Sequence, residues 1–142
     1  MAGINSTKVM QGGLVAAVVM TAIDFVAFGV VLQDGFAANL TRLGLDPAVL
    51  EAPAGFAAWL VTELVFGFLL VWTYAAMRPR FGPGPQTALM AAAVPFVSVN
   101  VVLASFVQNG ILDSGLFVSG LVASVLSIGA GAVAGAWVYK EG

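Results

Sequence analysis

The 142-residue chain contains neither cysteine nor histidine, and charged residues make up only 8% of it. Without cysteine, the chain can form no disulfide, no thiolate metal site and no cysteine nucleophile. Without histidine, it lacks the usual haem ligand, the usual zinc ligand and the commonest general base. A formal net charge of −2 provides no basic surface of the kind that binds nucleic acid. We therefore expect no enzyme, no metal site and no nucleic-acid partner, and haem is disfavoured.

Hydrophobic residues make up 61% of the chain, and its mean hydropathy is +1.03. This composition is typical of membrane proteins. A helix needs about 20 residues to cross the roughly 30 Å of hydrocarbon in a bilayer. Four apolar segments meet that length, near residues 12–32, 55–77, 87–108 and 115–139. The sequence thus predicts an all-α fold, a single integral membrane domain over residues 1–142 built as a four-transmembrane-helix bundle.

The basic residues predict how the chain is oriented. Lys8 precedes the first apolar segment, Arg78 and Arg80 lie between the second and third, and Lys140 follows the fourth. Only Arg42 lies on the opposite side. The positive-inside rule therefore places both termini and the loop containing Arg78 in the cytoplasm.

The two halves of the chain show a weak repeat. A Gln-Asx-Gly sequence follows the first and third apolar segments, at residues 33–35 and 108–110, and predicts a helix stop. A Trp-x-Tyr sequence closes the second and fourth, at residues 72–74 and 137–139. Two explanations stay open, a duplicated helical hairpin in a 2+2 arrangement or the shared preference of aromatic residues for the membrane interface.

The predicted outer segment between the first two helices, residues 34–54, mixes apolar and polar residues. Their spacing suits a short amphipathic helix on the bilayer surface or across the end of the bundle. Within it, Asp46 followed by Pro47 is typical of a helix N-cap with proline in the first turn.

The predicted cytoplasmic loop contains Arg-Pro-Arg-Phe-Gly-Pro-Gly-Pro at residues 78–85, preceded by Trp-x-Tyr and followed by Thr87 and Ala88. This stretch resembles a family of small bacterial four-helix integral membrane proteins of unknown function. The resemblance implies a bacterial inner membrane and carries over no activity and no site residues. Arg78 and Arg80 are either an orientation signal or contacts to anionic lipid or to a partner.

Two acids, Asp24 and Glu63, lie inside the apolar segments, where an ionisable residue costs roughly 2.5–3.5 kcal/mol. Counted along their helices at 1.5 Å per residue, both lie about 18 Å from the cytoplasmic edge. Asn100 and Ser124 fall near the same depth. The four are therefore predicted to form one polar cluster, in which at least one of the two carboxyl groups is protonated at neutral pH.

Small residues at four-residue spacing predict close helix packing. The fourth apolar segment contains Ser127, Gly131 and Gly135, and the first contains Gly13 and Ala17 on nearly the same face as Asp24. These stripes allow the helix backbones to approach each other.

Two functions fit these observations. The favoured one is a non-catalytic small accessory or structural subunit of a larger bacterial membrane complex, such as a respiratory or photosynthetic one. The alternative is a proton- or cation-coupled small-solute transporter that uses Asp24 and Glu63. Membrane lipids and other membrane subunits are the expected partners. A homo-oligomer and a bound lipid, quinone or pigment stay open.

Overall fold

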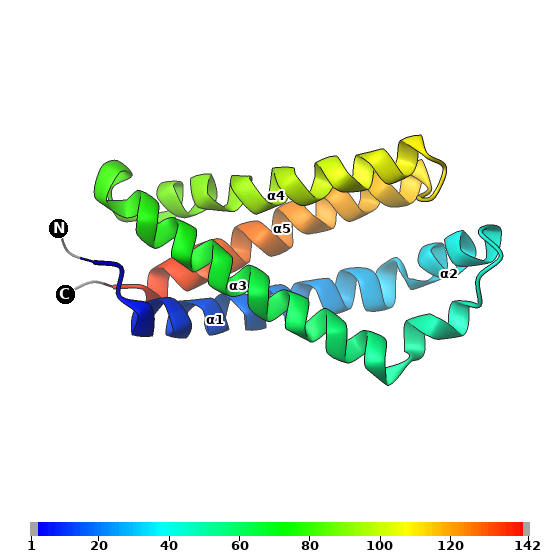
Figure 1. Ribbon diagram of the computed structural model, residues 1–142, viewed down its shortest axis with the longest axis horizontal. Coiled ribbons are helices and arrows are strands. Elements are labelled where there is room, and N and C mark those ends of the chain that lie inside the picture. The colour runs from blue at the N-terminus through cyan, green and yellow to red at the C-terminus, as the bar shows by residue number, and fades with distance from the viewer. Residues whose placement is uncertain (1–2, 141–142) are drawn as a thin grey trace.

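The computed structural model describes residues 3–140, which form helices and no strand (Figure 1). Four of the helices are long and apolar enough to cross a membrane, which confirms the predicted all-α fold with four candidate spans. The long helices are α1 (Ser6–Val26, continued by a π-helical turn, Ala27–Val31), α3 (Pro53–Phe81), α4 (Pro85–Gln108) and α5 (Ser114–Val138). A shorter helix, α2 (Gln33–Arg42), and a 3₁₀ turn (Pro47–Glu51) join α1 to α3.

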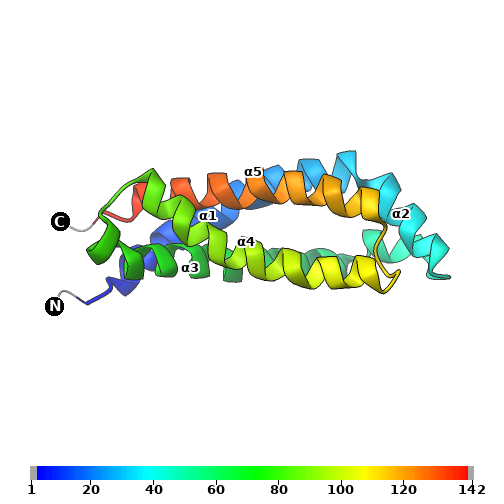
Figure 2. The same ribbon diagram turned by 90° about the horizontal axis from the view of Figure 1, so that it is seen from above.

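The bundle has two distinct ends. Figure 1 shows both termini and the α3–α4 turn at one end, here called the terminal end, and α2 with the α4–α5 turn at the other, the α2 end. Helix α1 packs against both α3 and α5, and α4 packs against α5 and α3. Seen from above, α4 and α5 run alongside each other (Figure 2). Helix α1 therefore lies between α3 and α5 and contacts both of them.

Two helix ends differ from the predicted limits. Helix α1 begins at Ser6 rather than near residue 12, because the Asn5 side chain caps it and accepts a hydrogen bond from the Lys8 N–H at 3.0 Å. Helix α3 continues to Phe81, so Arg78 and Arg80 lie in its last turn rather than in a loop. Pro79 lies inside this last stretch of the helix, where it removes the one backbone hydrogen bond that an N–H at this position would donate, and the helix ends soon after it at Phe81.

The predicted repeat is broken after α1. The Gln-Asp-Gly sequence at residues 33–35 is not a helix stop, because it opens α2, where Asp34 in the first turn suits the helix dipole. The Gln-Asn-Gly sequence at residues 108–110 does end α4, and Gly110 adopts φ 73°. The amphipathic helix expected in this segment is present as α2. Asp46 caps the 3₁₀ turn as predicted, accepting from the Ala48 N–H at 2.9 Å.

Glycines bring α1 against both of its neighbours. On one side, a Cβ at Gly67 of α3 would collide with the Gly13 carbonyl oxygen and lie 2.8 Å from the Ala17 backbone nitrogen. On the other side, a Cβ at Gly135 of α5 would lie 2.9 Å from the Gly12 carbonyl oxygen, and one at Gly131 would lie 2.5 Å from Met20 Cγ. No side chain fits at these contacts, so the glycines set the crossing points.

Candidate functional site

A pocket of about 560 Å³ opens between α1 and α3 on the α2 side of their crossing. Beyond the contact at Gly67, the two helices diverge toward the α2 end, as Figure 1 shows. The 3₁₀ turn and α2 border the gap. The pocket is lined by Asp24, Phe25, Phe28, Gly29, Gln33, Phe36, Leu50, Gly55, Phe56, Trp59 and Glu63.

Asp24 and Glu63, the two acids of the long apolar helices α1 and α3, meet in this pocket. Glu63 is buried, with 7% of its surface exposed, and Asp24 is partly buried. Their carboxyl groups lie within hydrogen-bonding reach of each other, and Glu63 is also within reach of the Trp59 side chain. Because a carboxylate only accepts hydrogen bonds, a bond between the two acids requires a proton on one of them. The pair can therefore hold one proton between its two members.

Ser127 of α5 completes this group from the third helix. Its hydroxyl is fully buried and lies next to Asp24. Among the residues that the structure describes, neither the Ser127 hydroxyl nor Asp24 Oδ1 has a partner in a hydrogen bond of full geometry. Buried polar atoms in proteins usually have at least one hydrogen-bond partner. Hydrogen-bonding capacity thus remains at the inner end of the pocket.

The register of α1 against α5 explains why Ser127 reaches Asp24. Gly135 lies against Gly12 and Ala16, and Gly131 lies against Ala16 and Met20, so each step of four along α5 matches a step of four in the opposite sense along α1. The next pair in this sequence is Ser127 with Asp24. The four-residue spacing of small residues along α5 predicts Ser127 as a packing residue. The same spacing, continued along α1, indicates its contact with Asp24.

The other two predicted members of the polar cluster lie elsewhere. Ser124 donates its hydroxyl to the Gly120 carbonyl of its own helix at 2.8 Å. Asn100 is buried and donates from Nδ2 to the Phe96 carbonyl of α4 at 2.9 Å. Neither residue lines the pocket. Equal depth in the membrane had suggested a four-helix layer, but helix rotation turns these two side chains to their own backbones.

Aromatic rings surround the two acids. Phe28 and Phe36 pack edge to face with centroids 6.0 Å apart, and Phe56 and Trp59 lie 5.5 Å apart on α3. Phe25 lines the same pocket. Rings attract cations through their faces, most strongly when water is excluded. An anionic inner end with aromatic walls is chemically suited to a cation that carries apolar substituents.

Helix α2 is attached to the opposite turn by polar contacts. Asn39 donates to the Ile111 carbonyl at 3.0 Å and accepts from the Asp113 N–H at 3.0 Å. Arg42 donates to the Gly110 carbonyl at 2.9 Å and to Asn39 Oδ1 at 2.7 Å. The π-helical turn at residues 27–31 joins this anchored helix to α1. Such turns recur at functional sites, and here it contributes Phe28 and Gly29 to the pocket.

Over residues 3–140, no group of three or more acidic, histidine or cysteine side chains is arranged to hold a metal ion. Comparisons with protein-family models, curated proteins and solved structures give no match to this chain.

Proposed function

We propose that this protein is a proton-coupled membrane transporter that binds a small apolar organic cation at Asp24 and Glu63. The observation that carries the proposal is the meeting of two carboxyl groups from antiparallel helices at the inner end of an aromatic-lined pocket. Intramembrane acids of this kind commonly mark proton or ion pathways. The positive-inside distribution and the resemblance of the 78–85 sequence support a bacterial inner membrane with both termini cytoplasmic.

Exchange of the cation for a proton follows from the electrostatics of the pair. Two ionised carboxylates close together in a medium of low dielectric repel each other and are poorly solvated. A proton relieves both costs, and so does a bound cation. The two ligands therefore compete, and loading the pocket with a cation releases a proton. Lowering the pH should weaken cation binding, because protonation removes the negative charge that attracts the cation.

Binding can be measured by calorimetry with the purified protein in detergent, using tetraphenylphosphonium as a probe that is both cationic and aromatic. We expect binding that strengthens as the pH rises. Asp24→Asn and Glu63→Gln should each weaken it by at least tenfold, because each substitution removes one of the two negative charges. The matched control is Asp34→Asn, which neutralises an exposed acid of α2 outside the pocket and should leave binding unchanged.

Transport requires a second measurement in liposomes. A pH gradient should drive uptake of the probe by the wild-type protein, and both pocket variants should abolish it. Binding without gradient-driven uptake would reject the transporter while leaving a cation-binding protein. Equal binding by the wild type and the Glu63→Gln variant would reject the site itself.

The accessory-subunit hypothesis is the second candidate, and the divergence of α1 and α3 favours it. A helix of another protein could occupy this gap with a basic or amide side chain directed at Asp24 and Glu63. Purification from native membranes in mild detergent separates the two candidates. A stable stoichiometric partner would support the subunit, whereas an isolated monomer or homodimer would support the transporter.

A further inference from the structure

A second pocket, of about 410 Å³, lies at the α2 end, between α2 and the start of α5. One base and one acid line it, Arg42 and Asp113, together with the polar side chains of Asn39 and Ser119. No residue lines both this pocket and the one that contains Asp24 and Glu63. Its chemistry is therefore independent of cation binding at those two acids.

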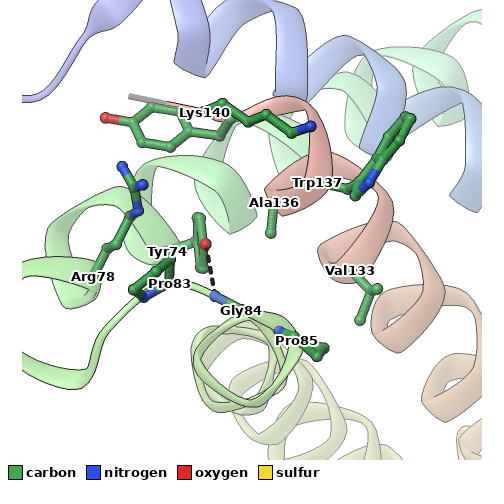
Figure 3. Close-up of a pocket in the computed structure, with 10 residues that line it drawn as sticks. Tyr74, Arg78, Pro83, Gly84, Pro85, Val133, Ala136, Trp137 and Lys140 are labelled. Atoms are coloured by element: carbon green, nitrogen blue, oxygen red, sulfur yellow. Dashed lines mark hydrogen bonds between the residues drawn. The ribbon is translucent and has the colours of Figure 1, made fainter. Parts of the chain in front are cut away.

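Arg42 is the one basic residue at this end of the bundle. The other four basic residues of the chain lie at the terminal end, and they are Lys8, Arg78, Arg80 and Lys140. Figure 3 shows Arg78 and Lys140 there, around a separate pocket that α2 does not reach. Positive charge at the α2 end thus comes from a single guanidinium.

The Arg42 guanidinium is fixed in place by hydrogen bonds to uncharged oxygens. Its Nη1 donates to the Gly110 carbonyl at 2.9 Å, and its Nη2 donates to Asn39 Oδ1 at 2.7 Å and to the Ile111 carbonyl at 3.3 Å. Among the residues that the structure describes, no carboxylate pairs with it. A guanidinium has five N–H groups, and these contacts use three of them, which leaves two for a ligand.

Asp113 provides the opposite charge from the start of α5. Its Oδ1 accepts from the Leu116 N–H at 2.9 Å as the N-cap of that helix, and its own N–H donates at 3.0 Å to the same Asn39 Oδ1 that Arg42 contacts. Asn39 is buried and so holds both residues in position. Arg42 and Asp113 are therefore anchored to one amide group without forming an ion pair with each other over residues 3–140.

The pocket also borders apolar surface at the ends of two candidate membrane spans. Leu32 and Leu116 line it, and so does Val31, which is 69% exposed. Next to these residues, Val30 is 63% exposed and Val118 is 60% exposed. Exposed valines on spanning helices are expected to contact acyl chains. A ligand in this pocket thus meets two opposite charges and, beside them, the lipid-facing side of the bundle.

We propose that this pocket binds phosphatidylethanolamine, a zwitterionic phospholipid. The lipid phosphate accepts hydrogen bonds from Arg42, its ammonium group donates to the Asp113 carboxylate, and its first chain carbons lie against Val31. Both contacts are charge-assisted hydrogen bonds, which are stronger than neutral ones. Phosphatidylglycerol has no cation for Asp113, and the quaternary ammonium of phosphatidylcholine has no N–H to donate. The headgroup that carries both an anion and an N–H cation fits both partners.

The test is native mass spectrometry of the full-length protein released from nanodiscs that contain equal amounts of phosphatidylethanolamine, phosphatidylcholine and phosphatidylglycerol. We expect one phosphatidylethanolamine to be retained in preference to the other two lipids. Asp113→Asn should lower its retention about fivefold, the upper range for one exposed ion pair. This variant keeps the helix cap, because asparagine caps helices as well as aspartate does. Arg42→Gln should lower retention to a similar extent.

Asp34→Asn is the matched control, because Asp34 is an exposed acid of α2 that lies outside the pocket. It should leave retention unchanged. Arg42 also holds α2 against the α4–α5 turn, so circular dichroism is used to identify a variant that fails to fold. Ser119→Leu is then the second variant, since it fills the pocket from an exposed position without changing any charge, and it should also lower retention.

Three outcomes would overturn the proposal. The first is equal retention of the three lipids by the wild-type protein. The second is a loss in the Asp34→Asn variant as large as that in Asp113→Asn. The third is displacement of the lipid by millimolar phosphoethanolamine, which would indicate a site for the free zwitterion rather than for a membrane lipid.

Discussion

Gly67 of α3 lies directly against the backbone of Gly13 in α1, at the point where the two helices cross. From there the helices diverge toward the α2 end, and the Asp24–Glu63 pocket occupies the space between them. The distance between the two carboxyl groups thus depends on how closely the helices approach at this glycine. The backbone contact between Gly67 and Gly13, which takes no part in binding, therefore sets the positions of the Asp24 and Glu63 carboxyl groups.

Replacing Gly67 with alanine should separate α1 from α3. Its Cβ would meet main-chain atoms of Gly13 and Ala17, which cannot rotate away as a side chain could. Overpacking of this kind costs about 1–3 kcal/mol. Unfolding of the purified protein in mild detergent measures the loss.

Gly129→Ala is the control for that substitution, because a Cβ there would lie 3.7 Å from Leu89 Cδ2, an ordinary contact distance. Its stability should match that of the wild type. If Gly67→Ala is equally well tolerated, the crossing does not depend on this glycine.

A double-mutant cycle tests the contact of Ser127 with Asp24. Ser127→Ala and Asp24→Ala should be coupled by about 0.6 kcal/mol, the average for side-chain hydrogen bonds between membrane helices. Stability in detergent is the measurement. The same cycle with Ser124→Ala should be additive, since the Ser124 hydroxyl binds its own helix at Gly120. Equal coupling for the two serines would contradict the register of α1 against α5.

Asn39→Ala should release α2 from the α4–α5 turn. The substitution removes hydrogen bonds to Ile111, Asp113 and Arg42, and such losses cost about 1–3 kcal/mol when they leave buried groups unpaired. Amide hydrogen exchange should accelerate in residues 33–42 and 109–113 and stay unchanged in α5. Thr41→Ala is the control, because the Thr41 hydroxyl donates to the Ala37 carbonyl of α2 itself. Unchanged exchange in Asn39→Ala would show that apolar contacts alone hold α2.

The orientation can be tested without a background substitution, because the chain has no cysteine. An impermeant maleimide added to intact cells should label Leu45→Cys, on the predicted outer side. It should label Gln86→Cys only after the membrane is permeabilised. Both positions are exposed. The reverse pattern would invert the assignment and place the acid pocket on the cytoplasmic side.

The sequence predicted those features that depend on residue composition and on the regular spacing of residues along a helix. Hydropathy located the four long helices, and small residues at four-residue spacing marked Gly131 and Gly135 as close-packing positions without indicating that their partner is α1. The partners of Asp24 depended on helix rotation, which hydropathy does not determine. Asn100 and Ser124 lie at a suitable depth but bond to their own helices. The close contact at Gly67 could not be predicted, because this glycine belongs to no regularly spaced set of small residues in the sequence.

The central claim is that a cation and a proton compete for Asp24 and Glu63, and proton release on binding tests it most directly. Tetraphenylphosphonium is added to the purified protein in a weakly buffered solution with a pH-sensitive dye. The account predicts release of about one proton for each cation bound, as linkage requires of competing ligands, and none from the Asp24→Asn, Glu63→Gln double variant. Cation binding with no proton release from the wild-type protein would contradict it.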